Sequence, residues 1–173
     1  MHKSINNLIS IQNELNSSSK NNLYPQIIAV SKTFTLEKIQ PLIDFGHLHY
    51  GENKVQEAIE KWTKIKNSSK NIKLHMIGKL QTNKVKNVIP LFDYIHSLDN
   101  LKLAKKISTE QIKLNKFLQI FIQVNIGNEV QKGGIDIINL KEFYNICVKE
   151  LRLNIIGLMC IPPQNNVETY FSK

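Results

Sequence analysis

Residues 27–34 read IIAVSKTF, an apolar run that ends almost directly in the lysine Lys32. The run at 27–30 is continuous rather than alternating, which is typical of a strand buried on both faces. Parallel α/β folds carry their chemistry at the carboxyl ends of the strands, and Lys32 stands at such an end. Lys32 is either a surface residue or a reactive amine at the mouth of the fold. The other residues of the chain have to distinguish these two interpretations.

The composition is that of an ordinary globular domain, with 173 residues of which 42% are hydrophobic and 21% charged. We therefore expect residues 1–173 to form a single domain with a substantial core. The apolar runs are far shorter than the ~20 residues of a membrane span, and the amino terminus shows no signal-peptide pattern. Cys147 and Cys160 lack metal-ligand spacing, so we expect reduced thiols in a cytoplasmic protein with no membrane partner.

The formal net charge is +9, from 23 Lys and Arg against 14 Asp and Glu. An excess of positive charge is one sign of a nucleic-acid-binding surface. The chain has a single arginine, Arg152, whereas proteins that read nucleic acids draw heavily on arginine. The lysines are scattered, and a genome rich in A and T explains the excess of Lys, Ile and Asn together. We expect no nucleic-acid partner, and a basic nucleic-acid-binding domain stays the second alternative.

Apolar runs alternate with amphipathic stretches along the whole chain, a pattern that predicts repeated β-α units with parallel strands. The predicted strands are residues 27–31, 47–51, 72–78, 94–99, 117–127 and 154–162. Helices are expected between them, and an opening helix over about residues 3–15. Such repeats either open into a doubly wound sheet or curve into a barrel, and a barrel normally needs eight strands.

Polar residues gather at the ends of these predicted strands. Lys32 follows the first strand, Asn53 follows the second, and His75 lies within the third. His75 is flanked by Leu74 and Met76, so its side chain points away from theirs, toward the interior of a barrel. A lone strand histidine is more often a core residue than a catalyst, and Asn53 could simply cap the next helix. GxGxxG, GxxxxGK[ST], HExxH and CxxC patterns are absent, so nucleotide and zinc sites have no support in the sequence.

Five ordered segments carry a specific resemblance. They are AVSK at 29–32, GEN at 51–53, HMIGKLQTNK at 75–84, QVNIGNEVQKGGI at 123–135 and GLMCIP at 157–162. Together they closely resemble the pyridoxal-phosphate homeostasis family, the YggS-type proteins that bind pyridoxal 5′-phosphate (PLP). The resemblance implies an α/β fold, a TIM-type (β/α) barrel like the N-terminal domain of alanine racemase. It also implies a role in intracellular PLP (vitamin B6) homeostasis.

The same resemblance assigns the cofactor-binding residues. Lys32 is the residue that would hold PLP as a Schiff base, with Asn53, His75 and Met159 as further cofactor-binding candidates. Schiff-base chemistry needs a neutral amine, and a lysine beside a dry barrel interior is partly desolvated, which disfavours the ammonium form. We therefore expect a partly desolvated Lys32.

The sequence also departs from the family. Lys79 stands where the family commonly has a proline, and we expect it to face solvent. Glu129 and Lys132 match a family segment that we expect to form a loop held by polar contacts. The family continues past residue 173 with two further strands, whose loops are expected to hold the phosphate.

The fold is therefore expected to be an incomplete barrel of about six of the eight strands, lacking the C-terminal strands. Open edges at the first and sixth strands would leave either a monomer or association through these exposed edge strands. We expect truncation to impair PLP binding unless another chain supplies the missing segment.

A PLP-dependent amino-acid racemase is the first alternative, because the resemblance includes the racemase barrel. A racemase needs a second acid/base residue on the opposite face of the cofactor and usually a partner domain. The sequence shows no second domain. We therefore expect a non-catalytic PLP-binding protein without catalytic residues.

Overall fold

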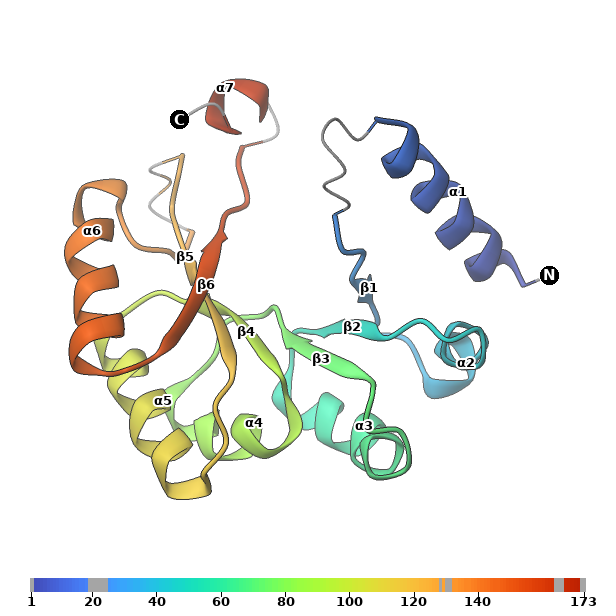
Figure 1. The fold of residues 1–173 in the computed structure, drawn as a ribbon, viewed down its shortest axis with the longest axis horizontal. Helices are drawn as coiled ribbons and strands as arrows, with labels where there is room; N and C mark the ends of the chain where they lie inside the picture. The colour runs from blue at the N-terminus through green and yellow to red at the C-terminus, as the bar shows by residue number, and fades with distance from the viewer. Residues whose placement is uncertain (1, 19–24, 128, 130–131, 164–166, 172–173) are drawn as a thin grey trace.

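The computed structural model describes residues 2–18, 25–127, 129, 132–163 and 167–171. Six parallel strands form one sheet in the order β1-β2-β3-β4-β5-β6, which is also their order along the chain (Figure 1). This order is the topology of a (β/α) barrel, since the order of a doubly wound sheet reverses at a switch point. The strands are β1 Ala29–Val30, β2 His49–Glu52, β3 Lys73–Met76, β4 Tyr94–Leu98, β5 Gln119–Gln123 and β6 Asn154–Met159.

Helices connect consecutive strands, as the alternating pattern predicts. Figure 1 shows α3, α4, α5 and α6 along the outer side of the curved sheet. The predicted opening helix is present as α1, which contacts α2. The helical elements are α1 Lys3–Ser18, α2 Leu36–Asp44, α3 Val55–Ser68, η1 Thr82–Lys84, α4 Val85–Leu91, α5 Leu101–Leu114, α6 Ile137–Asn145, η2 Ile146–Glu150 and α7 Val167–Phe171.

The ends of two helices follow directly from local chemistry. Pro41 lies inside α2, and the helix ends within one turn of it, at Asp44. Gly46 then takes a φ of +92°, a left-handed conformation that glycine adopts without the steric cost of a Cβ. At the start of α5 the Asn100 side chain accepts a hydrogen bond of 2.8 Å from the backbone N–H of Leu103.

The hydrophobic core lies between the sheet and its helices. Trp62 of α3 is fully buried there and rests against Tyr50 of β2, with ring centroids 4.8 Å apart. Alternate strand residues point into this layer, as the period of two requires, which leaves the other face of the sheet to a different set of side chains. The other largest fully buried side chains are Leu74, Met76, Ile89, Phe92, Ile95, Leu98, Leu103, Ile107, Leu118 and Ile120.

The edge strand β1 differs from the prediction. Only Ala29–Val30 forms a strand where residues 27–31 were expected, and Val30 is 46% exposed. The prediction of a strand buried on both faces is therefore wrong. Within the described residues β1 pairs only with β2, so its outer edge and one of its faces have no cover.

The strand β6 forms the opposite edge of the sheet. Ile156 is 42% exposed and Leu158 is 54% exposed on this strand. The two open edges that six strands were expected to leave are present in the described part of the chain.

None of the described helices is both long and apolar enough to cross a membrane.

Candidate functional site

The chain leaves β1 through a tight turn that carries Lys32. Ser31 keeps the register with β2, because its backbone N–H donates to the carbonyl oxygen of Gly51 at 2.9 Å. The backbone N–H of Phe34 then donates to the carbonyl oxygen of Ser31 at 3.2 Å, which closes the turn. Lys32 lies between these anchors and is exposed. The expected partial desolvation of Lys32 is therefore wrong, since the open edge of β1 leaves the residue without cover.

The turn is strained at Thr33, which follows Lys32. Its φ of +65° lies in the left-handed region, where a β-branched residue is an outlier. Conformations of this kind cost on the order of 1–3 kcal/mol and persist only where the surroundings determine them. Contacts around the turn must therefore hold it in place.

A buried group of polar side chains under the turn provides such contacts. We call Ser31, Glu52, Lys61 and Trp62 the Glu52 cluster. The Oε1 atom of Glu52 accepts three hydrogen bonds, from Ser31 Oγ at 2.8 Å and from Lys61 Nζ and Trp62 Nε1 at 2.9 Å each. Glu52 is fully buried and the Lys61 side chain is 11% exposed, so this is a buried ion pair. Lys61 Nζ also donates to the carbonyl oxygen of Ser31 at 2.8 Å.

The sequence interpretation missed the Glu52 cluster. Trp62 stands at helical spacing with other apolar residues and reads as a core side chain, which it also is. The one available signal was the acidic residue Glu52 at the end of a strand that precedes a helix with Lys61 on its inner side. A periodicity argument does not reveal that the indole N–H and the ammonium share one carboxylate oxygen.

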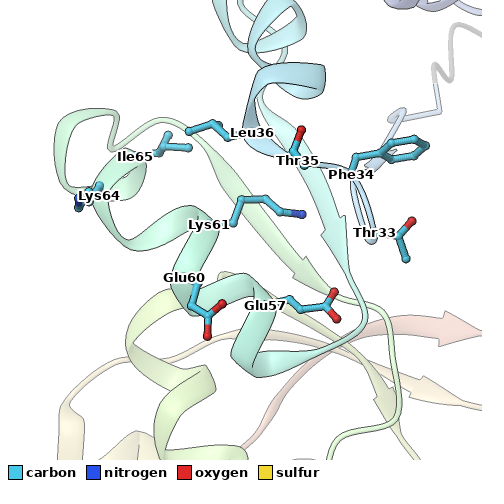
Figure 2. A pocket seen from close by; sticks show the side chains of 9 residues that line it. All are labelled: Thr33, Phe34, Thr35, Leu36, Glu57, Glu60, Lys61, Lys64 and Ile65. Atoms are coloured by element: carbon cyan, nitrogen blue, oxygen red, sulfur yellow. The ribbon is translucent and has the colours of Figure 1, made fainter.

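A cavity of about 670 Å³ lies on the helix side of the turn. Figure 2 shows Lys61 reaching across this cavity from α3, with Thr33 and Phe34 on the opposite wall. Glu57, Glu60 and Lys64 of α3 also line it, so its charges are mixed. The Lys61 side chain reaches the turn across this cavity. The lining of the cavity carries both signs of charge, so it does not indicate one class of ligand.

Asn53 follows β2, the strand that pairs with β1 and so precedes the loop beside the turn of Lys32 in the sheet order. Its side chain does not cap α3, because Lys54 is the N-cap residue of that helix. The Oδ1 atom of Asn53 is buried and has no hydrogen-bond partner among the described residues. Such an orphaned acceptor costs about 1–3 kcal/mol and calls for an explanation, of which a ligand is one. Any side chain at position 78 would overlap the Asn53 backbone, so Gly78 is needed where the two loops meet.

His75 lies on the face of the sheet opposite its neighbours, as predicted, and is 3% exposed. Its Nε2 atom is 3.0 Å from His49 Nδ1, and its Nδ1 atom is 2.9 Å from His96 Nε2. Its ring also stacks on Tyr94, with centroids 4.1 Å apart. Burial, with smaller contributions from the charges of His96 and His49, lowers the pKa of His75 to about 3, so the ring is neutral at pH 7.

The four candidate residues are only partly brought together. Lys32 and Asn53 follow the neighbouring strands β1 and β2, and His75 lies on the next strand, paired with Gly51. Met159 is half-buried at the end of β6, the opposite edge of the sheet. Lys32, Asn53 and His75 therefore lie on or directly after three neighbouring strands, whereas Met159 lies on the far edge strand.

The loop after β5 matches its prediction. Lys132 Nζ forms an ion pair of 2.6 Å with Glu129 Oε1. The Asn125 side chain donates to the carbonyl oxygen of Glu129 at 2.9 Å and accepts from its N–H at 3.2 Å. The expectation of a loop held by polar contacts is confirmed, as is the exposure of Lys79.

Within the described residues, no group of three or more His, Cys, Asp or Glu side chains is arranged to hold a metal ion.

Known proteins resemble the chain over most of its length. The family model described as "Alanine racemase, N-terminal domain" matches residues 6–172. The pyridoxal phosphate homeostasis protein of Aquifex aeolicus is 38% identical over 152 residues, which cover 86% of this chain and 66% of the relative. The relative of the same name from Buchnera aphidicola is 37% identical over 160 residues, which cover 90% of this chain and 69% of the relative.

Solved structures show the same relationship. PipY of Synechococcus elongatus PCC7942 without PLP superimposes with a TM-score of 0.82 at 30% identity, over 96% of this chain and 74% of PipY. The PipY structure with PLP bound gives a TM-score of 0.76 at 30% identity, over 92% of this chain and 72% of PipY. Alanine racemase of Clostridium difficile 630 shares the fold, with a TM-score of 0.63 at 16% identity over 90% of this chain and 40% of the racemase.

The parallel β/α fold and the family model over residues 6–172 show the class, which is that of the alanine racemase N-terminal domain. The six strands are an incomplete form of that barrel, as predicted. Within this class, the chain belongs to the pyridoxal phosphate homeostasis protein family. It spans about two thirds of the length of the curated relatives that it matches, 66% and 69% for the two above.

Proposed function

We propose that the chain binds pyridoxal 5′-phosphate through Lys32 and takes part in intracellular PLP homeostasis. The observation that carries the proposal is an exposed lysine on a strand-end turn beside Asn53, whose Oδ1 atom is buried and unpaired among the described residues. The names of the curated relatives and the PLP-bound structure of PipY support it.

The residues present fit the aldehyde end of the cofactor. When bound, PLP supplies an electrophilic aldehyde and an electron-withdrawing ring. Lys32 offers the primary amine that would hold the aldehyde carbon, and Asn53 offers an amide whose oxygen can accept a hydrogen bond. We propose that His75 lies under the site as a neutral ring. Its two nitrogens are engaged by the imidazoles of His49 and His96. Met159, on the other edge strand β6, is proposed as a further cofactor-binding residue.

We further propose that the chain is not a catalyst. Racemisation at an α-carbon needs an acid/base group on each face of the cofactor. The Glu52 and Lys61 side chains under the turn form an ion pair with each other. We also propose a cytoplasmic protein of one domain over residues 1–173, either a monomer or associated through β1 and β6, with PLP and not nucleic acid as its partner. The small share of arginine supports the last point.

The test is a titration of the purified chain with PLP. Binding should shift the visible absorption of PLP, and borohydride reduction should fix the cofactor on the peptide that contains Lys32. Lys32→Ala should lose both signals, whereas Lys79→Ala, which removes another exposed lysine, should keep them. Equal binding by Lys32→Ala and the unchanged chain would overturn the proposal.

Exchange of the α-proton tests the catalytic alternative. The PLP-loaded chain is incubated in D₂O with a panel of amino acids, and deuterium at the α-carbon is measured. We expect no exchange above that of free PLP. Exchange that disappears in Lys32→Ala would identify a racemase-like enzyme instead.

A further inference from the structure

The ammonium group of Lys61 lies under the backbone of the turn that carries Lys32. It donates to the carbonyl oxygen of Ser31 at 2.8 Å and to Glu52 Oε1 at 2.9 Å. The same Ser31 oxygen accepts the N–H of Phe34 that closes the turn. The carbonyl of Ser31 and the N–H of Lys32 belong to one peptide unit, which is planar. A group that fixes the direction of this carbonyl therefore also fixes the direction in which the chain enters Lys32.

Stability alone does not account for a buried ion pair at this place. Removing two charges from water costs several kcal/mol for each ion, and well-packed apolar residues are often at least as stabilising. An apolar pair could not donate to the Ser31 oxygen, however. Lys61 supplies a charge-assisted hydrogen bond there, which is stronger and more directional than one between neutral groups.

The strain at Thr33 points in the same direction. With φ at +65°, the residue after Lys32 stays in a conformation that a β-branched side chain disfavours. Without the bond from Lys61, the turn would lose one of the two contacts that hold the Ser31 oxygen. Relaxation of Thr33 to a negative φ would then turn Lys32 in another direction.

We propose that Lys61 and Glu52 are a positioning pair for Lys32. Glu52 holds the ammonium of Lys61 in place, and Lys61 holds the carbonyl of Ser31, so that the backbone enters Lys32 in one fixed direction. The inference rests on the proposed function, because the direction of Lys32 matters only if Lys32 is the residue that bonds to PLP.

The test compares three variants of Lys61 and its surroundings. Lys61→Met keeps the length of the side chain and removes the donor, whereas Lys61→Arg keeps a donor. Lys64→Met is the matched control, since Lys64 lines the same cavity on α3 but lies outside the Glu52 cluster. The loss of one charge-assisted bond is expected to slow bond formation between Lys32 and PLP by about tenfold in Lys61→Met. Lys61→Arg should recover most of this rate, and Lys64→Met should not change it.

Hydrogen exchange gives a second measurement that needs no PLP. The amide of Phe34 donates to the oxygen that Lys61 also binds, so its exchange should accelerate in Lys61→Met and not in Lys64→Met. Because Lys61→Met leaves the charge of Glu52 buried without its partner, that variant can fail to fold. The double variant Lys61→Met with Glu52→Gln removes both charges, and it should show the same slow bond formation and fast exchange.

The outcomes separate this inference from the proposed function. A folded double variant that bonds PLP at the rate of the unchanged chain would overturn the positioning pair. If the unchanged chain takes up no PLP, the proposed function fails instead. In that case hydrogen exchange at the Phe34 amide still tests the positioning pair. An exchange rate that is the same in all variants would overturn it.

Discussion

The Nδ1 atom of His75 lies 2.9 Å from the Nε2 atom of His96, on the face of the sheet opposite the helices. Because His49 approaches the other nitrogen of His75, three imidazoles form one continuous chain across β2, β3 and β4. Each contact needs one N–H and one free nitrogen, which neutral imidazoles supply. The chain is thus matched to the neutral form of these histidines.

Stability should therefore fall as the pH is lowered. Burial lowers the pKa of His96 to about 4, and burial together with the charges of His96 and His49 lowers the pKa of His75 to about 3. In the unfolded chain each of these histidines takes up a proton near pH 6.5. In the folded chain the same protonation requires a lower pH, so lowering the pH favours the unfolded chain. The stabilisation is complete above pH 6.5 and is lost between there and about pH 4 for His96 and about pH 3 for His75, by up to roughly 1.4 kcal/mol per pH unit for each histidine.

Urea denaturation at a series of pH values between 8 and 5 measures this slope. His96→Gln should reduce the slope by the contribution of one proton. A free energy of unfolding that stays constant between pH 7 and pH 5 would contradict the prediction.

The bond between Trp62 and Glu52 gives a prediction about stability at neutral pH. Trp62→Phe keeps an aromatic ring in the core but removes the N–H that donates to Glu52 Oε1. A hydrogen bond to a charged group contributes about 1.5–3 kcal/mol, and the smaller ring adds a cavity term. We expect a loss of at least about 2 kcal/mol in the free energy of unfolding. Circular dichroism should follow the unfolding, because the chain contains no other tryptophan. A loss within experimental error would show that the indole contributes by packing at most.

Tyr50→Phe is expected to act in the opposite direction. The ring of Tyr50 is fully buried against Trp62, and its hydroxyl has no hydrogen-bond partner among the described residues. Removing a buried unpaired hydroxyl relieves a desolvation penalty of about 1–3 kcal/mol, with little change in shape. The variant should be as stable as the unchanged chain or more so in the same urea titration. A clear destabilisation would mean that the hydroxyl has a partner.

A contrast between two glycines tests the junction beside Asn53. Gly78→Ala would overlap the Asn53 backbone, so the loops after β2 and β3 must move apart. Gly46→Ala meets no atom within 4 Å and bears only the cost of its left-handed backbone, about 1–2 kcal/mol. We expect Gly78→Ala to be the more destabilising of the two and to weaken PLP binding as well. Equal stabilities, measured by thermal unfolding, would argue against a close contact at Gly78.

The sequence predicted the parts of the fold that depend on local pattern. The apolar runs located all six strands of the sheet, and Lys32 was recognised as a strand-end residue. The exposure of Val30 and of Lys32 was not predictable in this way, because burial depends on what covers a strand. The Glu52 cluster was missed for a related reason. Its bonds join a strand end to a helix side chain, and no periodicity records such a contact.

Thr33→Gly tests whether the turn of Lys32 stores strain. Glycine adopts a φ of +65° without the clash that a β-branched residue meets, a gain of roughly 1–2 kcal/mol. The greater entropy of glycine in the unfolded chain offsets about 0.5–1 kcal/mol of it. We expect a small net increase in the free energy of unfolding, and a smaller one for Asn115→Gly, since asparagine tolerates its φ of +47° better. If Thr33→Gly were less stable than the unchanged chain, the side chain of Thr33 would be stabilising the turn and the strain argument would fail.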